Sequence, residues 1–342
     1  ADTPLIEIVS MPDLHSARDA HDYCKELWRL MTFAGVCLGD LYNGNMRFDV
    51  NVSIAEKGSK ILGKRAEIKN LNSFRSVERA IEYEYERQSK MLDAGEVIYQ
   101  ETRGWNDAIG KTTSQRSKEE AQDYRYMPEP DLPPIRLTAE EVQSEHDKMP
   151  LLPADYRSTL GMIIPQDILE ILLDYKNLVD KLAELKTEYD LQGVVKEISK
   201  ASILKISNLF TSVLLAEENA SLLNDPLPSA KQLIDLCQMI AKNELSSTST
   251  KEVFLRFFDP EMRFKETKII AKELNLIQEN DLGAVEQIVD DVLADPNNAQ
   301  AVSDFKSGSE KVLGFLVGQV MKASRGKANP GMAQEILRRK LA

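Results

Sequence analysis

The sequence predicts an α+β fold, in which a region of mixed strands and helices precedes two regions that are almost wholly helical. Residues 45–54 alternate apolar and polar side chains, as a strand with one buried face does. From about residue 138 onward, apolar residues recur at three- and four-residue spacing, which is typical of amphipathic helices. A chain of 342 residues is long enough for two or three domains. We therefore expect domains at residues 1–139, 140–275 and 276–342.

The first of these regions shows a clear order of strand and helix patterns. Its second strand is followed by a glycine-containing link and another alternating run, which together predict a hairpin. Gly35 and Gly95 are expected to end its two helices. In order, the expected elements are a strand at 6–9, a helix at 20–34, strands at 45–54 and 65–69, a helix at 73–94 and a strand at 97–103.

The remaining two regions show helical periodicity throughout, interrupted at Pro226 and Pro228, which cannot continue a helix. The helices expected there lie at 167–181, 194–215, 229–243, 264–274, 282–294, 300–323 and 331–341.

Composition excludes some classes of protein and leaves others open. No stretch approaches the roughly 18 uninterrupted apolar residues of a membrane helix. The net charge of −12 taken alone argues against nucleic acid. However, residues 276–304 hold seven acidic residues and no basic one, whereas residues 305–342 hold eight basic residues and two acidic ones. From charge alone, this basic end fits an RNA-contacting patch or solvated helix ends equally well.

The predicted hairpin carries the residues most suited to chemistry. Arg47, Asp49 and Asn51 alternate with apolar residues on one strand, and Glu67 and Lys69 do so on the next. Paired strands would gather both charge signs on one sheet surface, where carboxylates can hold Mg²⁺ and cations can offset the phosphates of ATP. The same pattern also fits an ordinary half-solvated antiparallel sheet.

Several long strings resemble a known family, in order and over essentially the whole chain: PLIEIVSMPD, GNMRFDVNVS, EIKNLNSFR, AIEYEYERQ, QETRGW, RSKEEAQDYRYMPEPDLPP and GFLVGQVMKASRGKANP. They are similar to the GatB family, one of the subunits of GatCAB-type aspartyl/glutamyl-tRNA amidotransferases. The resemblance implies that residues 1–139 are the second half of a glutamine-synthetase-like cradle domain, and that a helical domain and a tRNA-binding tail domain follow. It also implies that the first cradle half is absent, so that this chain alone is expected to be inactive.

The resemblance implies a reaction and its partners. Such a protein uses ATP and Mg²⁺ to phosphorylate the side-chain carboxylate of mischarged Glu-tRNA(Gln) or Asp-tRNA(Asn). Ammonia from the amidase subunit then displaces the phosphate, and a third, small subunit completes the complex. The expected compartment is a bacterial cytoplasm, or alternatively a mitochondrial or plastid matrix. The alternatives are a non-catalytic tRNA-binding module that uses only the helical and tail domains, and an unrelated α+β enzyme with a metal site.

The resemblance also assigns expected roles to individual residues. Glu7 matches a Mg²⁺ ligand, Arg47 and Lys69 are expected to neutralise phosphate, and Asp49 and Glu67 are expected to orient metal, water or cation. Weaker candidates for cofactor binding are Asn51, Asn70, Asn72, Arg103 and Arg116. The residues expected to face tRNA are Lys322, Arg325 and Lys327.

Overall fold

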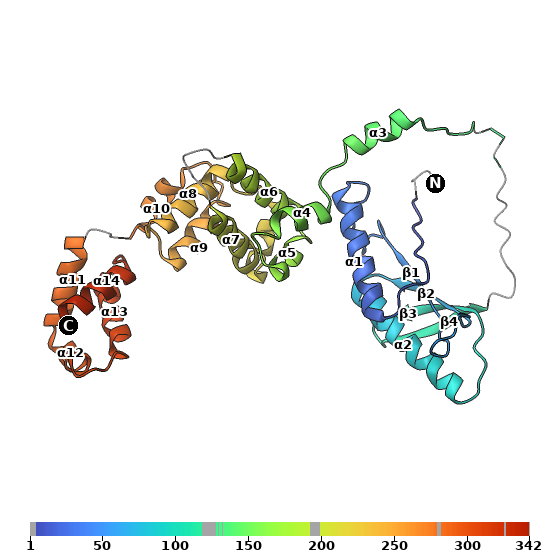
Figure 1. Cartoon of the computed structure of the whole chain (residues 1–342), viewed down its shortest axis with the longest axis horizontal. Helices are drawn as coiled ribbons and strands as arrows, with labels where there is room; N and C mark the ends of the chain where they lie inside the picture. Colours follow the sequence, from blue (N-terminus) through green and yellow to red (C-terminus); the bar gives the residue numbers. More distant parts are fainter. Residues whose placement is uncertain are drawn as a thin grey trace. The chain divides into compact units, whose positions relative to one another are not determined.

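The computed structural model divides the chain into two compact units, Ala1–Asp155 and Tyr156–Ala342, which are described separately below (Figure 1). The described residues are 5–117, 128, 130–131, 133–191, 199–278, 282–324 and 326–341, without the side chains of residues 116 and 117. The expected domain borders at 139/140 and 275/276 stay predictions. Most of the DYRYMPEP motif falls outside the described residues.

The first unit is built on a four-stranded sheet of order β1-β2-β3-β4. β1 and β2 pair antiparallel, as the predicted hairpin requires; β2 and β3 pair parallel, and β3 and β4 antiparallel. The elements, in chain order, are α1 (Ala17–Phe33), β1 (Phe48–Val52), β2 (Ala66–Leu71), α2 (Phe74–Asp93), β3 (Glu101–Asn106), β4 (Lys111–Ser117) and α3 (Ala139–Asp147).

Helices α1 and α2 cover one face of this sheet, and Figure 1 shows both beside it. The core between them is built from small and large apolar side chains that are at most 7 % exposed: Ala20, Cys24, Phe48, Ile68, Leu71, Val77, Ala80 and Trp105. Because successive strand residues point to opposite faces, the polar residues between these core positions lie on the other face of the sheet.

The ends of α2 follow the predicted signals closely. Ser73 is its N-cap, and the side-chain oxygen of Ser73 accepts a hydrogen bond from the backbone N–H of Ser76 at 3.0 Å. Past the other end, Gly95 has φ +72°, a left-handed conformation that glycine adopts without strain. Ser73 therefore fixes the start of α2 at the position where the helix was expected to begin.

Two strand predictions need correction. Residues 5–15 form no helix or strand, and Leu5, Ile6 and Val9 are more than 60 % exposed. A strand requires a hydrogen-bonded neighbouring strand, and no strand in the described part of the chain pairs with this segment. The strand expected at 97–103 begins at Glu101 instead, and Tyr99 before it is 73 % exposed.

The second unit is helical, as predicted. Its elements are α4 (Pro153–Leu160, which begins in the first unit), α5 (Gln166–Leu172), α6 (Lys176–Leu191), α7 (Lys200–Leu209), the π-helix η1 (Phe210–Leu214), the 3₁₀ helix η2 (Glu217–Asn224), α8 (Ala230–Ala241), α9 (Ser247–Arg256), α10 (Thr267–Glu273), α11 (Leu282–Ala294), the 3₁₀ helix η3 (Pro296–Asn298), α12 (Ala299–Lys306), α13 (Val312–Ala323) and α14 (Pro330–Leu341). No helix among the residues described above is long and apolar enough to cross a membrane.

Two helices predicted as continuous are broken. The helix expected at 167–181 is divided between α5 and α6, and the one expected at 300–323 is divided between α12 and α13. In the second case Gly308 has φ +100°, which no helix residue adopts, and so ends α12. Apolar periodicity resumes beyond each break, so spacing alone does not reveal it.

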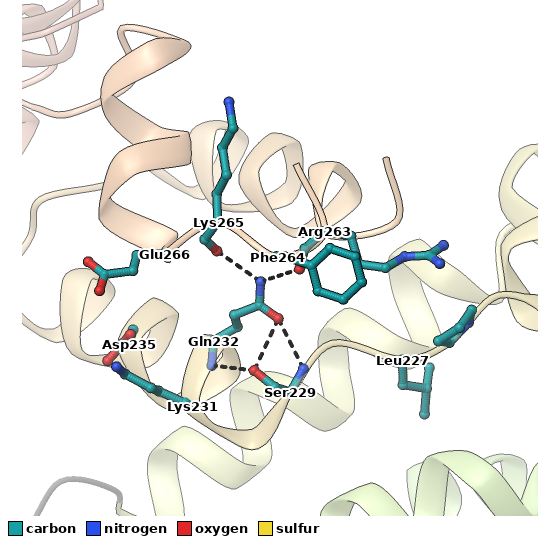
Figure 2. A pocket seen from close by; sticks show the side chains of 10 residues that line it. Leu227, Ser229, Lys231, Gln232, Asp235, Arg263, Phe264, Lys265 and Glu266 are labelled. Atoms are coloured by element: carbon teal, nitrogen blue, oxygen red, sulfur yellow. Dashed lines mark hydrogen bonds between the residues drawn. The ribbon is translucent and has the colours of Figure 1, made fainter. Parts of the chain in front are cut away.

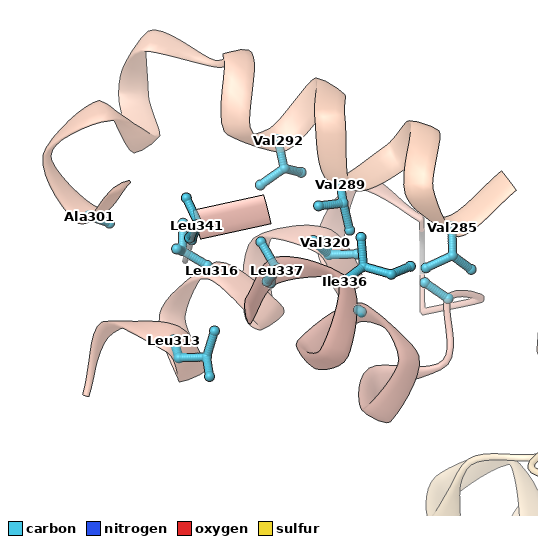
Figure 3. Packing of buried hydrophobic residues seen from close by; sticks show 12 residues of the cluster. Val285, Val289, Val292, Ala301, Leu313, Leu316, Val320, Ile336, Leu337 and Leu341 are labelled. Carbon is cyan, nitrogen blue, oxygen red and sulfur yellow. The ribbon is translucent and has the colours of Figure 1, made fainter. Parts of the chain in front are cut away.

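Helices α11 to α14 enclose an apolar core of their own (Figure 3). Val285 and Val289 from α11 point toward α13 and α14, whose Val320 and Ile336 belong to the same buried cluster. This core fixes which faces of α13 and α14 remain outside, and therefore where the basic residues of the tail lie.

Candidate functional site

The open face of the sheet brings together three of the predicted residues. The ammonium nitrogen Nζ of Lys69 lies 2.8 Å from Oδ2 of Asp49 and 3.2 Å from Oε1 of Glu67. The three side chains are 52 % (Asp49), 39 % (Lys69) and 19 % (Glu67) exposed. The result is a cation held between two carboxylates on a surface that a ligand can reach.

Strand pairing explains why these residues meet. Glu67 and Lys69 are two apart on β2 and so share a face, and Asn51 of β1 lies opposite Glu67. The register shifts between Phe48 and Val50, so that Lys69 and Asn70 together face the single residue Asp49. Asn70, whose φ is +67°, takes up the extra length in the left-handed conformation.

The two carboxylates hold Lys69 in its charged form. The hydrogen bond to Asp49 is the main cause of the raised pKa of the Lys69 ammonium; burial opposes it, and the hydrogen bond to Glu67 adds to it. An ammonium group with a raised pKa stays protonated at neutral pH. Lys69 is therefore suited to offset phosphate charge and unsuited to act as a base.

Thr102 belongs to the same group, although the sequence analysis did not single it out. Its hydroxyl Oγ1 donates to Oε2 of Glu67 at 2.9 Å, and Thr102 lies opposite Glu67 in the parallel pairing of β2 with β3. Only 6 % of Thr102 is exposed. No sequence signal could have found it, because the hydrogen bond depends on the β2–β3 pairing of residues 35 apart.

Gly104 and Gln115 form a second feature of this face that the sequence did not indicate. A Cβ on Gly104 would lie 2.2 Å from the side-chain nitrogen of Gln115 and 3.3 Å from that of Asn70. The β3–β4 register shifts between Thr102 and Arg103, which leaves Gln115 as the extra residue on β4. The two side-chain amides thus converge over the glycine, next to the row that contains Lys69.

Four other predicted residues that the structure describes form no hydrogen bond or ion pair with this group, although Asn51 lies opposite Glu67 across the strands. No hydrogen bond or ion pair joins Glu7 or Arg47 to any residue that the structure describes; both side chains are exposed, and Glu7 lies in the coil before α1. Asn51 and Asn72 are also exposed, Asn72 just before the N-cap of α2. The predicted roles of these four residues stay predictions.

Arg103 lies on the opposite face of the sheet, under α2. Its Nε is 3.0 Å from Glu84 and its Nη1 2.6 Å from Glu101, and its side chain is only 11 % exposed. Because Arg103 is one residue from Thr102 on the same strand, its side chain must point away from Glu67. The prediction that Arg103 lies beside the nucleotide is therefore corrected, because its side chain belongs to an ion-pair network on the helix-covered face. Arg116 pairs with Thr102 across the strands, but its side chain lies outside the described part of the chain.

The donor set fits Mg²⁺ only together with a nucleotide. Among the described residues, no three His, Cys, Asp or Glu side chains gather into a metal site. Asp49 and Glu67 supply two carboxylates, and Mg²⁺ is commonly held by one or two carboxylates with phosphate oxygens and water completing its octahedron. Lys69 between them would face the same phosphates.

The tail presents fewer free cations than its sequence suggested. Arg339 and Lys340 of α14 pair with Glu286 of α11 at 3.1 and 2.9 Å, and Arg338 pairs with Glu310 at 3.2 Å. The pairs with Glu286 join the acidic stretch to the basic end, whereas the Arg338–Glu310 pair lies within the basic end. Of the expected tRNA-facing residues, Lys322 and Lys327 are exposed and pair with no described residue, and Arg325 lies outside the described residues.

The second unit contains a pocket of about 340 Å³ at the start of α8 (Figure 2). Nε2 of Gln232 donates to the backbone carbonyls of Arg263 and Lys265 at 2.8 and 3.0 Å. The basic residues Arg263 and Lys265 share the pocket lining with acidic residues such as Asp235 and Glu266. We assign it no ligand, because neither charge sign dominates its lining.

Comparison with known proteins gives matches in both halves of the chain. A domain described as the GatB/GatE catalytic domain matches residues 1–143, and one described as the GatB domain matches residues 190–341. The B subunit of the aspartyl/glutamyl-tRNA(Asn/Gln) amidotransferase from Persephonella marina is 39 % identical over 98 % of this chain and 69 % of its own length. The chain belongs to the GatB family. The corresponding subunits of Alkalilimnicola ehrlichii and of a Geobacter species are 40 % and 38 % identical, over 100 % and 99 % of this chain and 69 % and 68 % of their own lengths.

Family membership places the polar sheet face within a catalytic domain. Asp49, Glu67, Lys69 and Thr102 all fall inside the region that matches the GatB/GatE catalytic domain. Lys322 and Lys327 fall inside the region that matches the GatB domain. The mixed strand and helix content of the first unit and the helical second unit agree with this GatB domain layout.

Proposed function

We propose that this chain acts as the GatB component of an ATP-dependent aminoacyl-tRNA amidotransferase, which converts Glu-tRNA(Gln) to Gln-tRNA(Gln), Asp-tRNA(Asn) to Asn-tRNA(Asn), or both. The names of its GatB relatives support this function. The observation that carries the assignment of the site is Lys69, held charged between Asp49 and Glu67 on the open face of the catalytic domain. The alternative of a purely tRNA-binding module is less favoured, because the matched domain is a catalytic one.

The chemistry requires a carboxylate to become a better acyl donor. ATP with Mg²⁺ supplies a phosphoryl group, which the side-chain carboxylate of the aminoacyl-tRNA accepts as ADP leaves. Ammonia then attacks the carbonyl carbon and inorganic phosphate departs, which leaves the amide. Each phosphoryl oxygen carries negative charge, so cations placed where that charge develops lower the barrier.

The residues of this chain have distinct parts in that reaction. Lys69 offers a fixed positive charge to the phosphates, and Asp49 and Glu67 hold its ammonium in place. The same carboxylates can share the metal ion that arrives with the nucleotide. The same proposal includes a glutamine-synthetase-like cradle as the fold of the first unit. It names the amidase subunit and the small subunit as partners. It also assigns contacts with tRNA to Lys322, Arg325 and Lys327.

Substitution of Lys69 tests the proposal. In the assembled amidotransferase, Lys69→Ala should lower the rate of ATP-dependent amidation by at least about a hundredfold, because a positive charge beside the transferring group is removed. The affinity for tRNA should change by less than about twofold. Lys57→Ala, in the exposed loop between β1 and β2, is the matched control and should retain full activity. Full activity of Lys69→Ala would refute the proposed site.

A further inference from the structure

We propose that Thr102 is a positioning residue for the carboxylate-activation site, because its hydroxyl fixes the Glu67 carboxylate and, through it, the ammonium group of Lys69. This inference rests on the proposed function, since it gives Lys69 a part in phosphoryl transfer. It goes beyond that function by naming the residue that sets the geometry of the cation.

The polar contacts form a continuous series from the interior to the surface. The Thr102 hydroxyl donates to Oε2 of Glu67 at 2.9 Å, the other carboxylate oxygen lies 3.2 Å from Nζ of Lys69, and Lys69 reaches Asp49 at 2.8 Å. Thr102 therefore occupies one oxygen of Glu67 and turns the other toward the ammonium. A carboxylate with one oxygen fixed cannot rotate without breaking a hydrogen bond to a charged acceptor.

Thr102 is buried, with 6 % of the residue exposed, and side-chain exposure then rises from 19 % for Glu67 to 39 % for Lys69 and 52 % for Asp49. The innermost hydrogen bond is the one least open to water, so water competes with it least. A lysine side chain has four flexible carbons and loses much rotamer freedom when fixed. Anchoring it through a buried partner means that less ordering is needed when the ligand binds.

A comparison within the sheet shows that burial alone does not explain Thr102. Thr112 on β4 is buried to a similar degree, and its hydroxyl donates to Glu84 on the helix-covered face, where it joins a structural ion-pair network. The acceptor of Thr102 instead lies on the open face, beside Lys69. Thr112 stabilises packing, whereas Thr102 orients a group that a ligand can reach.

Chemical labelling of lysine tests the positioning independently of activity. Competitive acetylation of the folded chain, read by mass spectrometry, gives the reactivity of Lys69 relative to the exposed loop lysine Lys57. Thr102→Val removes the hydroxyl with little change of shape, and it should raise the labelling of Lys69 about threefold by releasing Glu67. Thr102→Ser should restore slow labelling. In a Glu67→Ala chain, Thr102→Val should add no further change, because the partner through which it acts is gone.

Thr113→Val is the matched control, because Thr113 is an exposed β4 residue whose hydroxyl forms no hydrogen bond with any described residue. It should leave Lys69 labelling unchanged. Equal labelling of Lys69 in Thr102→Val and in the parent chain would overturn the inference. It would also be overturned if Thr102→Val raised Lys69 labelling by the same factor in the Glu67→Ala chain as in the parent chain. Should Thr102→Val fail to fold, as judged by tryptophan emission, Thr102→Ala replaces it in the same series.

Amidation by the assembled enzyme then tests the functional part. Thr102→Val should lower kcat about tenfold, with the KM for aminoacyl-tRNA unchanged, and Thr102→Ser should recover most of the rate. Full activity of Thr102→Val, with Lys69→Ala inactive, would overturn this inference alone. Full activity of Lys69→Ala would overturn the proposed role of Lys69 in the site, while the labelling result would still decide whether Thr102 fixes Glu67 and Lys69.

Discussion

Glu84 offers the sharpest test of what holds the sheet against α2. Its side chain is fully buried, and its two carboxylate oxygens accept hydrogen bonds from Nε and Nη2 of Arg87 at 2.8–3.1 Å. Nε of Arg103 lies 3.0 Å away, and Thr112 and Gln88 also donate to it. Glu84→Gln keeps the shape of this side chain and removes its charge.

The expected cost follows from the charges that remain. Without Glu84, Arg87 and Arg103 share only Glu101, which lies 3.4 Å from the first and 2.6 Å from the second. One positive charge is then uncompensated in a site where the arginines are 17 % and 11 % exposed. Removing one partner of a buried ion pair costs about 3–5 kcal/mol. Because Glu101 stays, we expect the lower end, a loss of about 3 kcal/mol in the free energy of unfolding.

The chain contains its own local probe for this measurement. Both of its tryptophans, Trp28 and Trp105, lie in the first unit, so urea unfolding followed by tryptophan emission reports that unit alone. Glu86→Gln on the same helix is the matched control. Glu86 pairs with Lys90 at the surface, where both side chains are more than 60 % exposed, and its loss should cost less than about 0.5 kcal/mol.

The effect of pH gives a second check with a definite sign. Burial would raise the pKa of Glu84, but hydrogen bonds from Arg87, Thr112 and Gln88 outweigh it and lower the pKa below the ordinary value of 4.5. Stability from this carboxylate is therefore fully present above that ordinary pKa and is lost as pH falls through the folded-state value. The difference between the parent and Glu84→Gln should be constant near neutral pH and narrow in acid. A loss below about 1 kcal/mol at neutral pH would refute the reasoning.

Two further predictions concern the tail and the thiols. Replacing Lys322 and Lys327 by Ala should weaken tRNA binding. It should also flatten the slope of log binding constant against log salt concentration by about one unit for each phosphate that is no longer bound. Arg338→Ala is the control and should change this slope less, because the guanidinium of Arg338 pairs with Glu310. Filter binding over a salt series measures this, and an unchanged slope would remove the two lysines from the interface. Burial raises the pKa of Cys24 and of Cys237 to about 11. A thiol reagent near neutral pH should therefore modify the partly exposed Cys37 first, as measured by peptide mapping. Equal modification of Cys37 and either buried thiol would contradict the structure.

The sequence predicted the parts of the site that depend on local pattern. Alternation on β1 and β2 placed Asp49, Glu67 and Lys69 on one face, because strand side chains alternate whatever the partner strands are. The same reasoning could not separate the faces of β3, since no apolar alternation marks the ETRGWN run. The family resemblance made Arg103 a weaker candidate for cofactor binding, and the local pattern could not correct this, although only its neighbour Thr102 faces the open side.

The sequence by itself determined the features that depend on neighbours within a few residues. Alternation predicted the hairpin, helical periodicity predicted the helical second unit, and Gly35 and Gly95 marked the ends of two helices. Only the tertiary structure decided which side chains meet. The parallel pairing of β2 with β3 brought Thr102 to Glu67, and the packing of α14 on α11 paired Arg339 and Lys340 with an acidic helix. Such pairs join residues tens of positions apart, and their geometry exists only once the sheet and the helical core have formed.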